Sequence, residues 1–247
     1  MESFSKIEEL VGFGFDVFNV LTEDSHWTTT DGKQVKTCAK TPVKKGKYAF
    51  KGWEKATHEE LKEAISYKHN GFGLRLGEQN NKCRIMSLDF DICGDKDSAG
   101  NRIGCPETAG LWEQYKTGVD REDGIYSSST EGNWNVLLDY SECEDIIGLI
   151  SKIGIAKIGK HHLEILLAKN QVIPPTATTC KRTGKLGKPR TFQNEIPFYR
   201  VAIGDFVYGF IKQLMEEYLE KQVKTTIPRV VSVASVSESE DDKSSKR

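Results

Sequence analysis

The chain has 247 residues, of which 37% are hydrophobic and 29% charged, a composition typical of a soluble globular protein with a core of its own. Its formal net charge is −1, so binding to a polyanion has to rest on local cationic segments. No stretch approaches the roughly 18 apolar residues of a membrane span, and the N-terminus lacks the layout of a secretion signal. We therefore expect an intracellular protein, cytoplasmic or nuclear, that is neither secreted nor bound to a membrane. The six cysteines form no CxxC pair, which favours free thiols over a disulfide framework.

The first part of the chain predicts helices and strands in alternation. Within residues 4–22 an amphipathic helical run gives way to the apolar, strand-like sequence FDVFNVL. Thr57 and Glu60 have the spacing of a capping box, so a helix is expected to start there. Two strands follow at residues 71–77 and 83–91, separated by a turn-like EQNN.

The second part predicts a loop at 94–106, a helix at 107–116, a hairpin at 125–140 and a short helix at 142–152. A strand is expected at 163–173 and a closing helix at 201–222. The Val/Ser-rich and then charged end of the chain has too few apolar residues to build a core. The predicted organisation is thus one α+β domain at 1–223 and a disordered charged tail at 224–247.

The pattern with the clearest chemistry is Asp89-Phe90-Asp91, at the end of an apolar strand. Residues i and i+2 of a strand point to the same face, so the two carboxylates repel each other unless a cation joins them. Mg²⁺ or Mn²⁺ is the natural partner of such a pair. The alternative is a strand end whose acids simply enter solvent.

Glu164, in the strand His162-Leu-Glu-Ile-Leu, is a candidate third metal ligand, because metal-dependent phosphoryl transfer often uses several acids around two ions. Taken alone it is an ordinary exposed strand acid. Zinc is not expected, because the spacing of Cys93, Cys105 and the histidines at 161 and 162 matches no usual ligand pattern.

Two cationic segments offer local sites for phosphates. Residues 33–55 carry eight lysines against one acid, with Tyr48, Phe50 and Trp53 among them, and residues 181–190 carry five cations and no acid. Lysines with interleaved aromatics can neutralise phosphates and stack bases, although a solvated loop has the same composition. No P-loop spacing is present, which excludes a helicase motor in this chain.

Taken in order, these pieces resemble the primase–polymerase (prim-pol) domain of the archaeo-eukaryotic primase superfamily, over residues of about 5 to 200. Lys40-Thr-Pro42 with Gly52-Trp53 is similar to the family's opening motif, and residues 71–77 are similar to a following strand. Ser87-Leu-Asp-Phe-Asp91 is similar to its metal-binding motif. Glu164-Ile-Leu, residues 171–176 and Thr183-Gly-Lys185 resemble the later motifs.

The resemblance implies a prim-pol fold with mixed or antiparallel sheets, flanked by helices around a carboxylate-lined cleft. It implies metal ligation and catalysis by Asp89, Asp91 and Glu164, and nucleotide binding by Asn135, Lys40 and Lys185. Nucleic acid is expected to contact a further set of residues: Lys44, Lys45, Lys47, Trp53, Lys181 and Arg182.

The sequence departs from the family at Asn135, which falls where a phosphate-contacting histidine is expected. Asparagine can donate a hydrogen bond but carries no positive charge. The third acid is glutamate, where aspartate is common in the family. The metal triad is therefore expected to be kept and the nucleotide clamp weakened.

The resulting hypothesis is a DNA replication protein of a mobile element or virus. It would synthesise primers or polymerise DNA on a template, using nucleoside triphosphates and Mg²⁺ or Mn²⁺ in a two-metal nucleotidyl transfer. With no motor in the chain, it either acts alone or belongs to a split system with a separate helicase. The alternatives are a catalytically degenerate prim-pol fold that binds DNA or a partner, and an unrelated metal-dependent nuclease.

Overall fold

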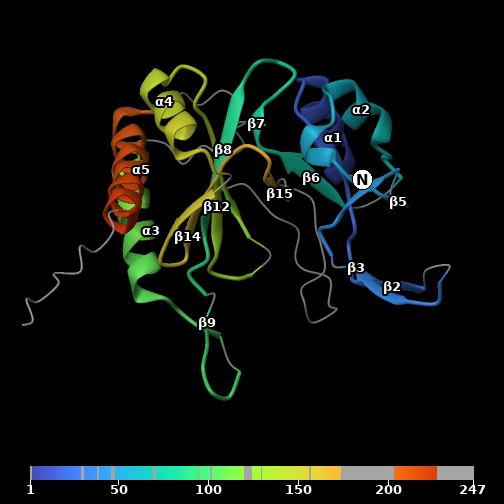
Figure 1. The fold of residues 1–247 in the computed structure, drawn as a ribbon, viewed down its shortest axis with the longest axis horizontal. Coiled ribbons are helices and arrows are strands. Elements are labelled where there is room, and N and C mark those ends of the chain that lie inside the picture. Colours follow the sequence, from blue (N-terminus) through green and yellow to red (C-terminus); the bar gives the residue numbers. More distant parts are fainter. Residues whose placement is uncertain are drawn as a thin grey trace, which may run out of the picture.

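A computed structural model of the protein describes residues 2–28, 31–37, 39–45, 48–68, 71–93, 95–100, 102–119, 124–128, 130–155, 157–173 and 203–226. Its architecture is α+β, built on a five-stranded and a six-stranded sheet in which every pairing is antiparallel. The two sheets form the two halves of the molecule in Figure 1.

The N-terminal half contains the five-stranded sheet, with strand order β15-β6-β1-β4-β5. Phe18 and Leu74 of this sheet are fully buried in a core that also takes Ile7 of α1 and Leu61 of α2. The elements of this half are α1 (Glu2–Gly12), β1 (Val17–Val20), β4 (Pro42–Lys44), β5 (Tyr48–Ala49), the 3-10 helix η1 (Trp53–Lys55), α2 (His58–Ala64), β6 (Phe72–Arg75) and β15 (Gln171–Val172).

The second half contains the six-stranded sheet, with the order β11-β12-β8-β14-β13 and with β7 paired to the start of β8. Helices α3, α4 and α5 pack together on one side of it (Figure 1). The elements are β7 (Gly77–Glu78), β8 (Arg84–Phe90), α3 (Pro106–Gly118), β11 (Ile125–Ser127), β12 (Trp134–Asp139), α4 (Glu144–Ile153), β13 (Lys157–Lys160), β14 (Leu163–Leu166) and α5 (Asp205–Thr226).

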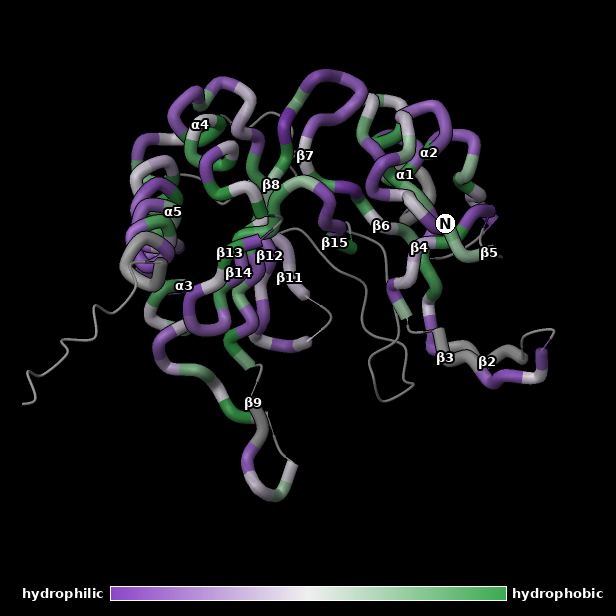
Figure 2. Tube along the Cα trace, viewed as in Figure 1, coloured by the Kyte–Doolittle hydropathy of each residue, from purple (hydrophilic) through white to green (hydrophobic). Residues whose placement is uncertain are grey.

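Strand β8 lies at the centre of the second sheet, and its two faces pack differently. Met86, Leu88 and Phe90 are fully buried in the core beneath the three helices. On the other face Ile85 joins the core of the N-terminal half, and the positions that follow on that face, Ser87 and Asp89, are polar. In Figure 2 the hydrophobic colour correspondingly gathers along the strands around β8. The face is therefore apolar where the N-terminal half packs and polar beyond it.

Most predicted elements are confirmed, and the differences lie where pairing is non-local. The capping box of Thr57 and Glu60 is present. The expected strand 163–173 is two strands, because β14 pairs with β8 while β15 crosses to β6 in the other sheet. Strand β13 was not predicted, and the closing helix α5 runs to Thr226, three residues beyond the predicted domain end at 223. The rest of the predicted tail lies outside the described residues.

Two small hairpins were also not predicted. Strands β2 (Ser25–Thr28) and β3 (Gln34–Thr37) pair with each other, as do β9 (Asp95–Lys96) and β10 (Arg102–Ile103) inside the expected loop 94–106. Both extend away from the helices in Figure 1. Their strands have two to four residues, which is at or below the shortest length over which the alternation of a half-buried strand can be recognised.

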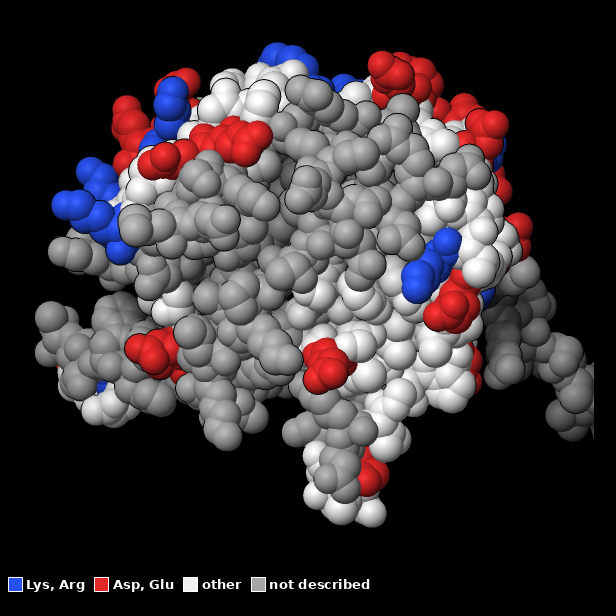
Figure 3. Space-filling model, turned by 180° about the vertical axis from the view of Figure 1, so that it is seen from behind, with Lys and Arg blue, Asp and Glu red and all other residues white. Residues whose placement is uncertain are grey.

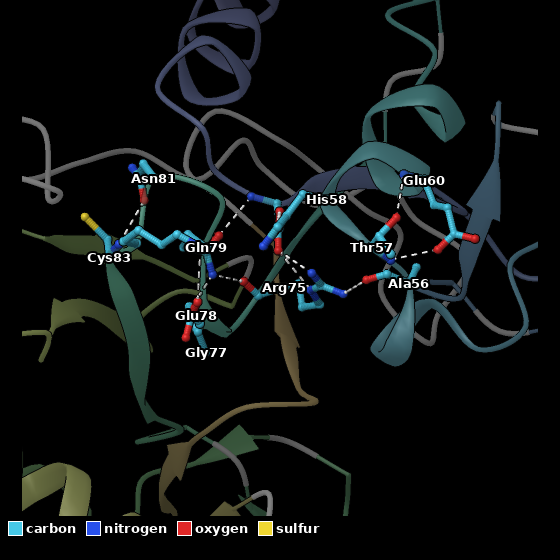
Figure 4. A network of polar contacts seen from close by, with 12 residues as sticks. Ala56, Thr57, His58, Glu60, Arg75, Gly77, Glu78, Gln79, Asn81 and Cys83 are labelled. Atoms are coloured by element: carbon cyan, nitrogen blue, oxygen red, sulfur yellow. Dashed lines mark hydrogen bonds and ion pairs between the residues drawn. The ribbon is translucent and has the colours of Figure 1, made fainter.

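A buried polar network ties the N-terminal elements together (Figure 4). The carboxylate of Asp16, whose side chain is 2% exposed, accepts hydrogen bonds from two guanidinium nitrogens of Arg75 on Oδ2. Its Oδ1 lies 2.6 Å from Nδ1 of His58 at the start of α2. Gln79 accepts from the Asp16 amide and donates to the carbonyls of Arg75 and Gly77. Each oxygen of the buried carboxylate thus has a donor, which a buried charge requires.

Among the described residues, no helix has both the length and the apolar character needed to cross a bilayer.

Candidate active site

The polar face of β8 brings the predicted acids into one row with residues of its two neighbouring strands. Asp89 is opposite Asn135 of β12 and opposite Glu164 of β14. Directly opposed residues of antiparallel strands share a face, so the three side chains project side by side. Asp91, two residues after Asp89, continues on the same face, and its amide donates to the carbonyl of His162 at 2.9 Å.

Asn135 lies on β12, directly opposite Asp89. Its side chain is buried, and its Nδ2 donates to Oδ1 of Asp89 over 2.6 Å. The amide therefore fixes the orientation of the central carboxylate.

Asn133 plays the same part for Asp91 and was not predicted. It is 4% exposed, its Nδ2 donates to Oδ1 of Asp91, and its Oδ1 accepts from the amide of Cys93 at 2.6 Å. Asn133-Trp-Asn135, at the start of β12, thus matches Asp89-Phe-Asp91, at the end of β8, and each amide bonds to one carboxylate. The period of two in the asparagines was the sequence signal, but the glycine beside them made a turn the obvious interpretation.

The pKa of Asp89 is raised to about 6. Burial contributes most and the charge of Asp91 comes next, while the ammonium of Lys40 and the hydrogen bond from Asn135 lower it, and Glu164 raises it. A carboxyl that titrates near neutral pH is the kind of group that functional sites contain.

Glu164 shares the row, but its side chain turns to the neighbouring strand β13. Its Oε1 lies 2.6 Å from Nζ of Lys157, and both side chains are well exposed, 42% and 55%.

The donor set fits a divalent cation, because three carboxylates on adjacent strands of one face are the hard oxygen ligands that Mg²⁺ takes. The side-chain directions do not gather them. In the part of the chain that the structure describes, no three His, Cys, Asp or Glu side chains are grouped closely enough to hold a metal ion. Asp89, Asp91 and Glu164 instead bond to Asn135, Asn133 and Lys157, respectively.

Lys40 belongs to the other half of the molecule and yet acts on Asp89. It has a left-handed backbone, with φ of 70°, which is unusual for a residue other than glycine. The conformation is held at both ends: its amide donates to the carbonyl of Leu21 at 2.8 Å, and its carbonyl accepts from Nε2 of Gln171 at 2.7 Å. Two hydrogen bonds thus fix the backbone of the lysine whose charge lowers the pKa of Asp89.

The other predicted cations divide into two groups. Lys44 lies with its Nζ 4.6 Å from the centre of the Phe50 ring, and the amide of Lys45 donates to the last residue of α2, Ala64. Both exposed lysines thus belong to the α2 side of the half. Lys47, Lys181, Arg182 and Lys185 lie outside the described residues.

Trp53, predicted to stack on nucleic-acid bases, is half-buried, with its ring 4.9 Å from that of Phe18. Its carbonyl also accepts from Arg75. These contacts are those of a residue at the edge of the core.

Neither the family models nor the curated proteins contain a match to this sequence.

The surface charge is mixed. In Figure 3, the described Lys and Arg side chains on the rear face form separate small groups with acids close by, and no single basic face is formed among them.

The cysteines and histidines considered for zinc also do not form a ligand cluster among the described residues. The thiol of Cys105 instead lies near Thr108 and Glu107 at the start of α3.

Proposed function

We propose that this chain is a prim-pol replication protein that transfers nucleotidyl groups on a DNA template. The observation that carries the proposal is the row on the second sheet, in which Asp89, Glu164 and Asn135 share one register on three adjacent strands. Asp91 stands beside it. The proposal includes a prim-pol fold in which this face lines the catalytic cleft between the two halves.

In the proposed mechanism Asp89, Asp91 and Glu164 would hold Mg²⁺ or Mn²⁺. When bound, such ions neutralise phosphate charge and activate the attacking hydroxyl. Asn133 and Asn135 keep the two aspartates in one orientation, so little reorganisation is needed when substrate binds.

Lys40, whose charge lowers the pKa of Asp89, is proposed to hold phosphates of the nucleotide together with Lys185. The lysines at 44, 45 and 47, with Trp53, Lys181 and Arg182, are proposed to contact the template. The hydroxyl oxygen at the primer end, or on an initiating nucleotide, attacks the α-phosphorus. The bond from the α-phosphorus to the pyrophosphate oxygen breaks, pyrophosphate leaves, and the hydroxyl proton passes to solvent. A separate helicase would supply unwound template in a split system.

A second function has its own observation in support. The amide nitrogen of Asn135 donates to Asp89, and Glu164 forms an ion pair with Lys157. These polar side chains thus have partners within the protein. A degenerate prim-pol fold that binds DNA or a partner without catalysis would have this arrangement.

Primer extension with Mn²⁺ distinguishes these functions. A primed DNA template with deoxynucleotides, and an unprimed template with ribonucleotides, are incubated with the wild type and with the double variant Asp89→Asn/Asp91→Asn. Product from the wild type alone supports nucleotidyl transfer. Undiminished synthesis by the double variant contradicts the assignment of the acids, DNA binding without product supports the degenerate fold, and strand degradation indicates a nuclease.

A further inference from the structure

The corner of the sheet where β13 meets β14 holds a lysine against the acid row. Gly159 is directly opposite Glu164, and Lys157, two residues before Gly159, lies on the same face. Among the described residues, a Cβ at Gly159 would meet within 4 Å only the carbonyl oxygen of Leu163, at 3.6 Å, and Gly159 itself is exposed, so the surface beside Glu164 is open. The long side chain of Lys157 crosses this surface diagonally to reach Glu164.

This ion pair is a weak one despite its short distance. Both partners are in contact with solvent, with exposed fractions of 55% for Lys157 and 42% for Glu164. An exposed pair of this kind shifts an equilibrium by only roughly two- to fivefold. A divalent cation held by Asp89 and Asp91 can therefore draw the Glu164 carboxylate away at small cost.

Lys157 then keeps its positive charge on the same face and loses its carboxylate. The neighbouring acids would be neutralised by the cation, and an anion is the remaining partner for the ammonium. A triphosphate next to the acid row is such an anion.

We propose that Lys157 is an anion-binding residue of the acid site. Its ion pair with Glu164 keeps it from binding an anion until a divalent cation binds the Glu164 carboxylate. This inference rests on the proposed function and adds to it a residue and a coupling. Because binding free energies are linked reciprocally, cation binding should strengthen triphosphate binding, and triphosphate binding should strengthen cation binding by the same factor.

The first test separates this role from a structural one by the sign of two effects. Mn²⁺ alone is titrated into the protein and the free ion is followed by its paramagnetic resonance. Fluorescently labelled deoxyadenosine triphosphate is then titrated at saturating Mn²⁺. In Lys157→Ala, Mn²⁺ should bind roughly two- to fivefold more tightly, because a competing cation is gone. The nucleotide should bind roughly five- to tenfold more weakly, because a charge-assisted contact is lost.

The matched control is Lys160→Ala. Lys160 lies on the same strand and forms a comparable ion pair, 2.9 Å from Glu217 of α5, but it projects from the other face of the sheet. Its loss should change neither affinity.

The second test releases Lys157 without a metal. Glu164→Gln should bind inorganic triphosphate, in the absence of divalent ions, several-fold more tightly than the wild type. In the Lys157→Ala background the same Glu164→Gln change should give no gain, whereas a gain due only to the removed negative charge would appear there as well and overturn the proposal.

The remaining outcomes are equally decisive. Lys157→Ala behaving like Lys160→Ala, or weakening both ligands together, overturns the role of Lys157 and leaves the proposed function standing. Failure of the wild type to bind Mn²⁺ overturns both.

Discussion

At Asp89, burial and the charge of Asp91 act in the same direction, since both raise the pKa, here to about 6. The folded state thus holds a proton on Asp89 at pH values where the unfolded chain, with a pKa of about 3.9, has released it. Stability contributed by this proton is present below about pH 4 and is lost as the pH rises through about 6. The ionised carboxylate is therefore a cost to the fold at neutral pH, as is common for groups kept for function.

Replacing Asp89 with asparagine should consequently stabilise the protein at pH 7, by about 1–2 kcal/mol. The new amide oxygen can still accept the hydrogen bond from Asn135. The gain should disappear near pH 4, where the wild-type side chain is protonated. Urea unfolding at both pH values measures the effect, with the exposed acid Glu113 of α3, changed to glutamine, as the control. Equal or lower stability of Asp89→Asn at pH 7 would contradict the account of this carboxyl.

Substitutions of Asn135 distinguish a catalytic prim-pol fold from a degenerate one. Histidine at this position could still donate to Asp89 and would add partial positive charge beside the acids. If the site is catalytic, Asn135→His should lower the nucleotide KM by roughly tenfold, since a contact to a charged group contributes about 1.5–3 kcal/mol. Asn135→Ala should raise the KM. The nucleotide KM is measured by steady-state kinetics on a primed template. If neither Asn135→His nor Asn135→Ala changes the KM, the nucleotide is held by other residues.

Among the elements, the first β-strand, the helix α2 and strand β6 depend on the network around Asp16. Arg75 supplies the positive charge that this buried carboxylate needs, and its Nη1 also donates to the carbonyl of Ala56 before α2. Removing one partner of a buried pair leaves the other charge uncompensated.

Arg75→Met should therefore lower the free energy of unfolding by about 3–5 kcal/mol. Arg75→Lys keeps the charge and loses the planar fork, so its loss should be smaller and the variant should still fold. Lys82→Ala is the control, because Lys82 pairs with Glu78 at 3.6 Å with both side chains largely exposed. Urea unfolding curves compare the three variants; a loss for Arg75→Met no larger than that for Lys82→Ala would show that the network contributes little.

The elements that the sequence predicted well have local signals. The alternation in β8 and the capping box of α2 are each contained in a few residues. Strand β14 stops at Leu166, by contrast, because of a distant partner: β7 pairs with Arg84 and Ile85 at the other end of β8, which leaves Ser87 to Phe90 for β14. The sequence at 167–170 carries no proline or glycine to mark the break.

The same distinction holds for the site. The shared face of Asp89 and Asp91 follows from the period of a single strand, and so it was predictable. The partner of Glu164 was not, because Lys157 meets it only through the pairing of β13 with β14. The contact of Gln171 with Lys40 spans 131 residues of chain, and no local pattern announces it.

At the scale of the whole molecule, two crossings within the described residues join the halves, and the second of them starts near the acid row. Strand β6 leads through β7 into β8, and β14 leads into β15. The second crossing starts beside Glu164 and ends at Gln171, whose amide holds the carbonyl of Lys40. Lys40 in turn lowers the pKa of Asp89 on the opposite sheet. The crossing thus connects the backbone of a cation in one half with the strand that carries Glu164 in the other.

Gln171→Ala should therefore raise the pKa of Asp89, although Asp89 itself is unchanged. Loss of the hydrogen bond removes about 1 kcal/mol of support for a left-handed lysine, so Lys40 is expected to relax and its ammonium to move away. The pKa of Asp89 then rises, and the pH midpoint of Mn²⁺ binding should rise with it. Lys40→Met, which removes the charge itself, should give at least as large a shift in the same direction.

The control for this prediction is Lys45→Met. Lys45 also has a left-handed backbone, with φ of 50°, but its amide bonds to the end of α2, and its charge is not among those that shift Asp89. Its loss should leave the midpoint where it is. A shift for Lys40→Met with none for Gln171→Ala would mean that Leu21 alone holds the lysine. Equal shifts for Lys40→Met and Lys45→Met would mean that the midpoint reports only the net charge of the protein, and that the two halves are not coupled through this crossing.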